Sequence, residues 1–234
     1  ILGHIAENFP QVSHLVWVVN QKLNSSFSDL PFHIWKGETY MKERLGNADF
    51  MISPVSFFQT NPQQAKVLYD VVRNMLTDCL PEGRTTHHVV YDLYAGTGSI
   101  GIYVADLAEK IVGIEYVTEA IEDAKKNVAL NQLEHFSFYA GDMRKILTDD
   151  LMSREGQPDV VIADPPRNGM DAKVVAQLLK AKPQYIIYVS CKASTQARDI
   201  DLMREAYEVV SIQPVDMFPH TAHVENVAFL KRKD

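Results

Sequence analysis

The sequence has little cysteine and no long apolar run. Cys79 and Cys191 are its two cysteines, too few for a disulfide framework or a four-cysteine metal or cluster site, so we expect a reducing, cytoplasmic location. No apolar stretch reaches the roughly 18 residues of a membrane span, and no basic-then-apolar signal pattern opens the chain. The first residue is Ile1 rather than Met, which predicts a piece of a longer protein.

Positive charge is also scarce. The 23 Lys and Arg residues stand against 30 Asp and Glu, and the net charge is -7. This balance argues against binding nucleic acid by general electrostatic attraction and leaves room for a local basic patch. With 234 residues and 46% hydrophobic content, the chain can bury one large domain or one domain with an appendage. We expect a monomer with no membrane partner.

The first 57 residues combine short apolar runs with turn-forming residues. Runs at 15–19 and 50–52 predict strands, and residues 24–26 and 46–48 predict turns. We therefore expect a small β-rich domain over residues 1–57. A helix should follow, because Asn61 is a suitable N-cap for Pro62 and apolar residues recur with helical spacing until about residue 81.

From residue 89 onward, β-branched runs alternate with helical patterns. This alternation predicts an open α/β fold over residues 58–234, a doubly wound and mostly parallel seven-stranded sheet. The last two runs are joined by a connection without room for a helix, so the last strand should be antiparallel. The expected strands are 89–93, 111–115, 136–139, 159–163, 185–189, 207–212 and 226–230.

A glycine loop follows the first of these strands. The run Gly96-Thr97-Gly98-Ser99-Ile100-Gly101 lets the backbone approach a ligand, and a carboxylate at the end of the second strand can accept both ribose hydroxyls. Those features suit a nicotinamide cofactor or S-adenosylmethionine. Acidic residues after the third strand, where an adenine amine could bind, and after the fourth favour S-adenosylmethionine. The expected cofactor residues are Gly96, Gly98, Glu115, Asp142 and Asp164.

The run Asp164-Pro165-Pro166-Arg167 ends the fourth strand. Two prolines restrict the backbone, so the Asp164 carboxylate should point into the cleft at the carboxyl end of the sheet. A strand-terminating turn is the plainer interpretation. Arg167 offers a planar fork suited to a phosphate or a base edge. We therefore expect Asp164 and Arg167 to contact a substrate.

Cys191 follows the fifth strand, at the edge where open α/β sheets bind ligands. A lone cysteine near a strand usually belongs to the core. Here Lys192, Arg198 and a helix start near residue 194 would favour the thiolate form. A place beside a methyl-donor cleft then favours a catalytic cysteine.

A thiolate in such a cleft suits methylation of a pyrimidine at carbon 5. That carbon of uracil is a weak nucleophile, but thiolate addition to carbon 6 converts the ring to an enolate that can attack a methyl group. A base must then remove the proton from carbon 5. Glu225 fits that role because its loop enters the last strand beside the cleft. His220 and His223 form a weak metal pattern, and we expect no metal.

Five blocks of sequence carry a resemblance to a known family. They are Phe57-Phe58-Gln59-Thr60-Asn61, Asp92-Leu93-Tyr94-Ala95-Gly96-Thr97-Gly98, Asp164-Pro165-Pro166-Arg167-Asn168-Gly169, Tyr188-Val189-Ser190-Cys191 and the segment from Asp216 to Glu225. The chain resembles the RNA uracil-5-methyltransferases, which modify the tRNA T loop and uridines of large-subunit rRNA. The resemblance implies a class I methyltransferase fold and an RNA partner, with rRNA placed ahead of tRNA. It implies S-adenosylmethionine at Gln59, Tyr94, Glu115 and Asp164, Cys191 as nucleophile and Glu225 as base.

The chain departs from the family pattern in one place. The family has Asn-Pro after its cysteine, whereas this sequence has Lys192-Ala193, which affects the expected loop and its RNA contacts more than the chemistry. Many members add an N-terminal RNA-binding barrel, and some a four-cysteine iron-sulfur site. Residues 1–57 resemble the small central domain of the family, so we expect the natural protein to extend upstream.

Three other functions were weighed against this one. A cytosine-5 RNA methyltransferase would carry a second cysteine after the fourth-strand proline, where this chain has Pro166-Arg167. A nicotinamide oxidoreductase would leave Cys191 and Glu225 without a joint role. A non-catalytic RNA-binding module would need neither residue.

Overall fold

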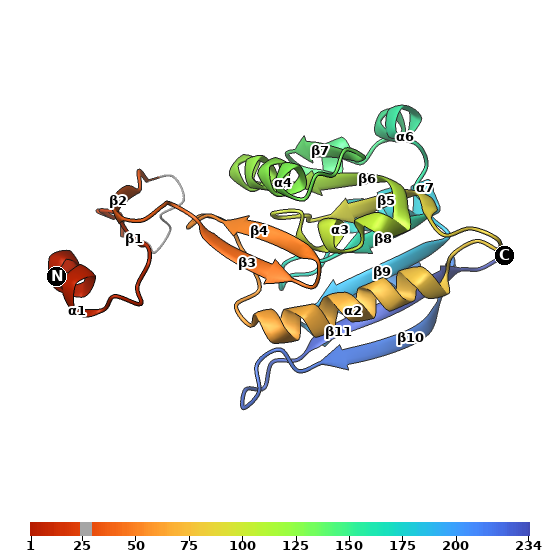
Figure 1. Cartoon of the computed structure of the whole chain (residues 1–234). Helices are drawn as coiled ribbons and strands as arrows, with labels where there is room; N and C mark the ends of the chain where they lie inside the picture. Colours follow the sequence, from red (N-terminus) through yellow and green to blue (C-terminus); the bar gives the residue numbers. More distant parts are fainter. Residues whose placement is uncertain (24–29) are drawn as a thin grey trace.

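The computed structural model describes residues 1–23 and 30–234, and the predicted turn at 24–26 lies outside the described residues. Its centre is a single seven-stranded sheet (Figure 1). All seven predicted strands are confirmed, several of them with longer ends. They are β5 (His87–Leu93), β6 (Ala108–Glu115), β7 (Phe136–Ala140), β8 (Val160–Ala163), β9 (Tyr185–Ser190), β10 (Tyr207–Val215) and β11 (Glu225–Arg232).

The strand order fixes where the sheet can hold a ligand. The order is β10-β11-β9-β8-β5-β6-β7, with parallel pairing from β9 through β7. Strands β6 and β7 extend the sheet on one side of β5, and β8 and β9 extend it on the other. Ligands of doubly wound sheets bind at such a reversal, beyond the carboxyl ends of the strands. As predicted, the last strand is antiparallel, and β11 lies between β9 and β10.

Helices cover both faces of the sheet because alternate strand residues are apolar on both sides. Val90 belongs to one buried cluster and its neighbour Tyr91 to the other. The first cluster includes α2 and α3, with α4 packed beside them, and the second includes α5 to α8. The bounds are α2 (Pro62–Asp78), α3 (Ser99–Tyr103), α4 (Thr118–Leu130), α5 (Met143–Ile146), α6 (Asp149–Glu155), α7 (Ala172–Ala181) and α8 (Ala193–Met203), with a 3-10 turn at Ala105–Leu107.

The helix predicted after Asn61 is α2. The Asn61 side chain accepts a hydrogen bond from the backbone N–H of Gln64, and Pro62 occupies the first turn. Its apolar stripe is buried at Ala65, Leu68 and other positions. Its start is therefore as expected, and it ends at Asp78, somewhat before the predicted end near residue 81. Cys79, just after the helix, is 7% exposed and belongs to the core.

The N-terminal region is small and contains strands, as predicted, but the prediction missed a helix. Helix α1 (Leu2–Asn8) precedes β1 (Leu15–Trp17), which pairs antiparallel with β2 (His33–Lys36). Helix α1 has no buried residue and no side-chain cap, so its sequence shows no clear apolar stripe. Strand β2 was missed for a similar reason, since three of its four residues are exposed. Figure 1 shows these elements away from the main sheet.

A second hairpin, β3 (Met41–Leu45) and β4 (Ala48–Ile52), lies against the main domain. Gly46 makes the predicted turn with a φ of +57°, a conformation that glycine adopts without strain. Leu45 and Phe50 are buried in the same cluster as α2 and the sheet. The division of the chain at residue 57 stays a prediction, and the burial of this hairpin provides a test of it.

Within the described residues, no helix is long and apolar enough to cross a membrane. In residues 1–23 and 30–234, no group of three or more His, Cys, Asp or Glu side chains is arranged to hold a metal ion.

Replacing Phe50 tests whether the hairpin belongs to the main core. The Phe50 side chain is 0% exposed, so Phe50→Ala should lower the free energy of unfolding by about 3 to 5 kcal/mol. Met41, on the partner strand, is 57% exposed, and Met41→Ala should change it by less than about 0.5 kcal/mol. Urea denaturation measures both. Equal, small losses would mean that the hairpin folds apart from the core.

Candidate active site

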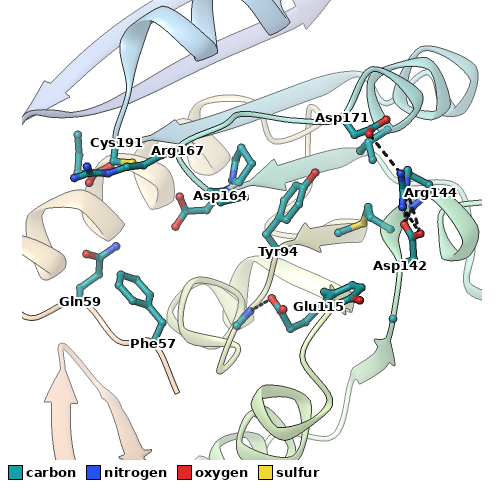
Figure 2. Close-up of a pocket in the computed structure, with 18 of the residues that line it drawn as sticks. Phe57, Gln59, Tyr94, Glu115, Asp142, Arg144, Asp164, Arg167, Asp171 and Cys191 are labelled. Atoms are coloured by element: carbon teal, nitrogen blue, oxygen red, sulfur yellow. Dashed lines mark hydrogen bonds and ion pairs between the residues drawn. The ribbon is translucent and has the colours of Figure 1, made fainter. Parts of the chain in front are cut away.

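One large cavity lies beyond the carboxyl ends of the parallel strands (Figure 2), with a volume of about 880 Å³. Successive strands each deliver a side chain to it, because parallel strands end at the same edge of the sheet. Nine of the ten predicted site residues line this cavity: Gln59, Tyr94, Gly96, Glu115, Asp142, Asp164, Arg167, Cys191 and Glu225.

The pairing of β9 with β11 brings Cys191 and Glu225 to one place. Ser190 lies opposite Asn226 in this antiparallel pair. One step further in the same register, Cys191 follows β9 directly across from Glu225, the first residue of β11. Cys191 is partly exposed, whereas Glu225 is 9% exposed. Residues 34 apart in sequence therefore both line the cavity.

Glu115 is held in place by the backbone of two loops. One carboxylate oxygen accepts from the N–H of Gly96 at 3.0 Å, and the other accepts from the N–H of Val117 at 2.9 Å. Each oxygen keeps a lone pair for a ligand hydroxyl. Tyr94 begins the same loop with a φ of +62°, an uncommon conformation for an aromatic residue that often marks a functional turn.

Asp142 lies at the far end of the cavity from Cys191, beside Glu115 (Figure 2). It caps α5 by accepting from the backbone N–H of Arg144, and the Arg144 guanidinium binds the same carboxylate at 2.7 Å. Hydrogen bonding by Arg144 lowers the pKa of Asp142 to about 2. Asp171 from the cap of α7 lies 3.7 Å from Arg144. An acidic group that is always ionised therefore lines this end.

Two carboxylates, Asp164 and Glu225, line the cavity, and the buried Asp92 acts on Asp164 electrostatically. Burial, followed by the charges of Glu225 and Asp92, raises the pKa of Asp164 to about 8. Burial also raises the pKa of Asp92 to about 7, although the N–H of Gly101 donates to it. Burial raises the pKa of Glu225, and Arg167 partly offsets this. Asp164 therefore mostly carries a proton at neutral pH, and a cation bound nearby would favour its ionised form.

Two expectations about the surroundings of the site differ from the structure. Gly98 does not line the cavity, because it forms the left-handed start of α3 with a φ of +75°, facing Ala124 and Phe138. Arg198 does not serve the cysteine, because its guanidinium binds the buried Asp199 at 2.6 Å and the backbone of the 168–170 turn. The helix expected to start near residue 194 is α8, which begins at Ala193 with Lys192 as its N-cap.

Several residues of the cavity have no functional assignment from the sequence alone. Phe57 and Tyr116 are 72% and 74% exposed aromatics at its rim. Exposed aromatics beside an acidic strand end could have been a signal for Tyr116, which follows Glu115. Arg144 and Asp171 are joined only through the fold, so no local pattern points to them.

A family model described as tRNA (uracil-5-)-methyltransferase matches residues 37–233. The chain is 46% identical over 231 residues to an uncharacterized RNA methyltransferase of Bacteroides thetaiotaomicron and 47% identical over 234 residues to one of Porphyromonas gingivalis. Each alignment covers 99% of this chain but 50% and 49% of the relative. The chain thus spans about half the length of the curated relatives it matches.

Solved structures agree on the fold. A Pyrococcus abyssi tRNA (uracil-54, C5)-methyltransferase in complex with S-adenosyl-L-homocysteine aligns with a TM-score of 0.78 and 34% identity, covering 93% of this chain and 50% of that one. An M. jannaschii tRNA m1G37 methyltransferase aligns with a TM-score of 0.62 at 18% identity, covering 88% and 61%, and shows the shared fold alone. The fold is that of class I methyltransferases. The extent of the family match shows that the chain belongs to the tRNA (uracil-5-)-methyltransferase family.

Proposed function

We propose that this chain transfers a methyl group from S-adenosylmethionine to carbon 5 of a uridine in RNA, through a covalent bond to Cys191. One observation carries the proposal: the register of β9 and β11 brings Cys191 and Glu225 together on the wall of the cavity that also holds Glu115 and Asp164. A dinucleotide cofactor would use Glu115 but would leave Cys191 and Glu225 unused.

The residues at the Glu115 end fit S-adenosylmethionine. Glu115 has its two oxygens fixed by backbone N–H groups and lines the cavity, where their remaining lone pairs could accept from a ribose diol. Asp142 and Tyr116 line the neighbouring surface, suited to an adenine amine and an adenine ring. When bound, S-adenosylmethionine would supply an electrophilic methyl group on its sulfonium cation. That cation would lie toward the carboxylates of Asp164 and Glu225, whose pKa values are raised chiefly by burial, and its positive charge would favour their ionised forms.

The other end of the cavity provides the residues that act on the uracil ring. The Cys191 thiolate adds to carbon 6 of uracil, and the ring electrons move to carbon 5 and the adjacent carbonyl oxygen, so carbon 5 becomes nucleophilic. After methylation, Glu225 takes the proton from carbon 5, the carbon 5–carbon 6 double bond re-forms, and the cysteine sulfur leaves. Glu225 must be ionised for this step. Since its pKa is raised, it loses base activity at a higher pH than an exposed glutamate does.

The RNA itself is proposed to enter from the Cys191 end. Arg167 and Lys192 are exposed there, and Arg167 can bind a phosphate or a base edge. Gln59 and Phe57 line the cavity and lie on the same side of it as Cys191 in Figure 2, so Gln59 is proposed to serve the uracil as well as the methyl donor. A tRNA and a large-subunit rRNA are both consistent with these contacts. Mapping the uridines that lose a 5-methyl group in a deletion strain identifies the RNA.

Removing the nucleophile should abolish the reaction. Cys191→Ala leaves no thiolate to activate carbon 5, so methyl transfer should fall below detection. The assay uses the natural-length protein, methyl-labelled S-adenosylmethionine and RNA from a strain lacking the gene. Cys79→Ala is the control and should stay active, because Cys79 lies in the core away from the cavity. Nucleoside analysis of the product should give 5-methyluridine, and 5-methylcytidine would overturn the proposal.

Removing the catalytic base, Glu225, should stop the reaction at a later stage. Glu225→Gln can still add Cys191 to the ring and methylate carbon 5, but it cannot take the remaining proton. A covalent RNA adduct carrying the label should accumulate and appear as a shifted band on a denaturing gel. Normal turnover by this variant, or the same adduct with Cys191→Ala, would contradict the assigned roles.

Removing Glu115 should weaken cofactor binding without touching the chemistry. Loss of a charged hydrogen-bond partner predicts that Glu115→Ala weakens S-adenosylmethionine binding by about 1.5 to 3 kcal/mol. Calorimetry measures this, with Glu119→Ala as an exposed control in the first turn of α4. An unchanged dissociation constant, or tighter binding of NAD than of S-adenosylmethionine, would refute the cofactor site.

A further inference from the structure

Helix α4 and its C-cap residue carry three polar side chains on one face, at intervals of four residues. They are Asp123, Asn127 and Asn131, the first two being 7% and 0% exposed. Residues four apart lie above one another on a helix, so this is a single polar stripe. Buried polar groups are costly unless each finds a partner.

The partners of this stripe lie along β4 and the turn after it. Asn131 accepts from the N–H of Asp49 at 2.9 Å and donates to its carbonyl at 2.7 Å. Asn127 accepts from the N–H of Met51 at 2.7 Å. Asp123 accepts from the hydroxyl of Ser53 at 2.5 Å. The stripe thus provides hydrogen-bond partners for backbone groups on the edge of β4 that faces away from β3.

The rise per residue of a helix and of a strand explains why these hydrogen bonds line up. Four residues of helix rise about 6 Å, and two residues of strand rise about 6.7 Å. The positions 131, 127 and 123 can therefore match 49, 51 and 53 in order, with the strand running antiparallel to the helix. The side chains of the stripe bind backbone groups of β4 that a neighbouring strand would otherwise bind.

Two further hydrogen bonds of the stripe connect it to the proposed site. Asp123 also accepts from the hydroxyl of Ser56 at 2.5 Å, next to Phe57, and Phe57 and Gln59 line the cavity. Asn127 donates to the carbonyl of Thr97 at 3.3 Å, inside the glycine loop whose Gly96 N–H holds Glu115. One helix therefore holds both the segment at the Cys191 end and the loop at the Glu115 end.

We propose that Asp123 and Asn127 are positioning residues, which fix the segment 53–59 against the glycine loop so that Phe57 and Gln59 meet the target base. This inference rests on the proposed function. Asp123 acts through Ser53 and Ser56, and Asn127 acts through Met51 and Thr97.

The charge on Asp123 is maintained by its neighbours. Burial raises the pKa of Asp123, but the hydroxyls of Ser53 and Ser56 and the ammonium of Lys126 outweigh it and leave the pKa below its ordinary value. Lys126 is 3.0 Å away and has a side chain that is 61% exposed. The two hydroxyls therefore donate to an ionised acceptor, the stronger form of this hydrogen bond.

The test removes the two hydroxyls and separates base positioning from cofactor binding. The double variant Ser53→Ala and Ser56→Ala should lower kcat/KM for RNA about tenfold, measured with the natural-length protein and RNA from a strain lacking the gene. The dissociation constant for S-adenosylmethionine should change less than threefold, because Gln59 is one of several cofactor contacts and Glu115 and Asp142 at the other end are untouched. Lys126→Met is the matched control. It removes the other partner of Asp123, keeps both serines and should leave kcat/KM nearly unchanged.

Each other outcome has a defined meaning. Unchanged kcat/KM in the double variant overturns the inference, as does parallel weakening of cofactor binding, which would make the cluster a support of the fold alone. If the double variant loses its cooperative thermal unfolding, the single variant Ser56→Ala, which retains the Ser53 bond, is judged by the same two measurements. A wild-type protein without methyl transfer would refute the proposed function itself, whereas an active wild type with unaffected variants refutes this inference only.

Discussion

The antiparallel pairing of β11 with β9 is the constraint on which the proposed chemistry depends. If β11 ran parallel to β9, its first residue would lie at the opposite edge of the sheet from Cys191. Because it runs antiparallel, its beginning lies where β9 ends, and the register that joins Ser190 to Asn226 puts Glu225 across from the cysteine. A shift by one residue would turn the Glu225 side chain to the other face. The buried residues Val227 and Leu230, on opposite faces of the sheet, fix that register.

The electrostatics of the cavity complement a cationic ligand. Asp92, Asp164 and Glu225 lie in a poorly solvated region with Arg167 as the nearby basic group acting on Glu225, and all three have raised pKa values. Such an arrangement destabilises the empty, fully ionised site, and a sulfonium near it relieves the repulsion. The same carboxylates would disfavour an anionic pyrophosphate, which agrees with the choice of S-adenosylmethionine over a dinucleotide.

The sheet and much of the site could be predicted from the sequence because both depend on local patterns. Buried parallel strands are continuous runs such as Val160–Ala163, and the acidic residues stand directly after them. The glycine motif predicts a cofactor contact at Gly98. A motif does not say which of its glycines lines the cavity and which one allows the chain to turn. Arg198 was assigned to the cysteine by proximity in sequence, whereas its partner Asp199 is revealed by the burial of that carboxylate. Helix α1 and strand β2 bury too little to leave a periodic signal.

The polar stripe of α4 was the least predictable feature, because Asp123, Asn127 and Asn131 look like the solvated face of an ordinary surface helix. Asp123 and Asn127 are buried and Asn131 is partly buried because the hairpin β3–β4 covers them. An apolar stripe there could bury as much surface, but it would leave the N–H of Asp49 and Met51 without partners and would not set the strand's position along the helix. Directional hydrogen bonds do both. A segment that must present Gln59 and Phe57 at a defined distance from the glycine loop therefore gains more from amides and a carboxylate than from leucines.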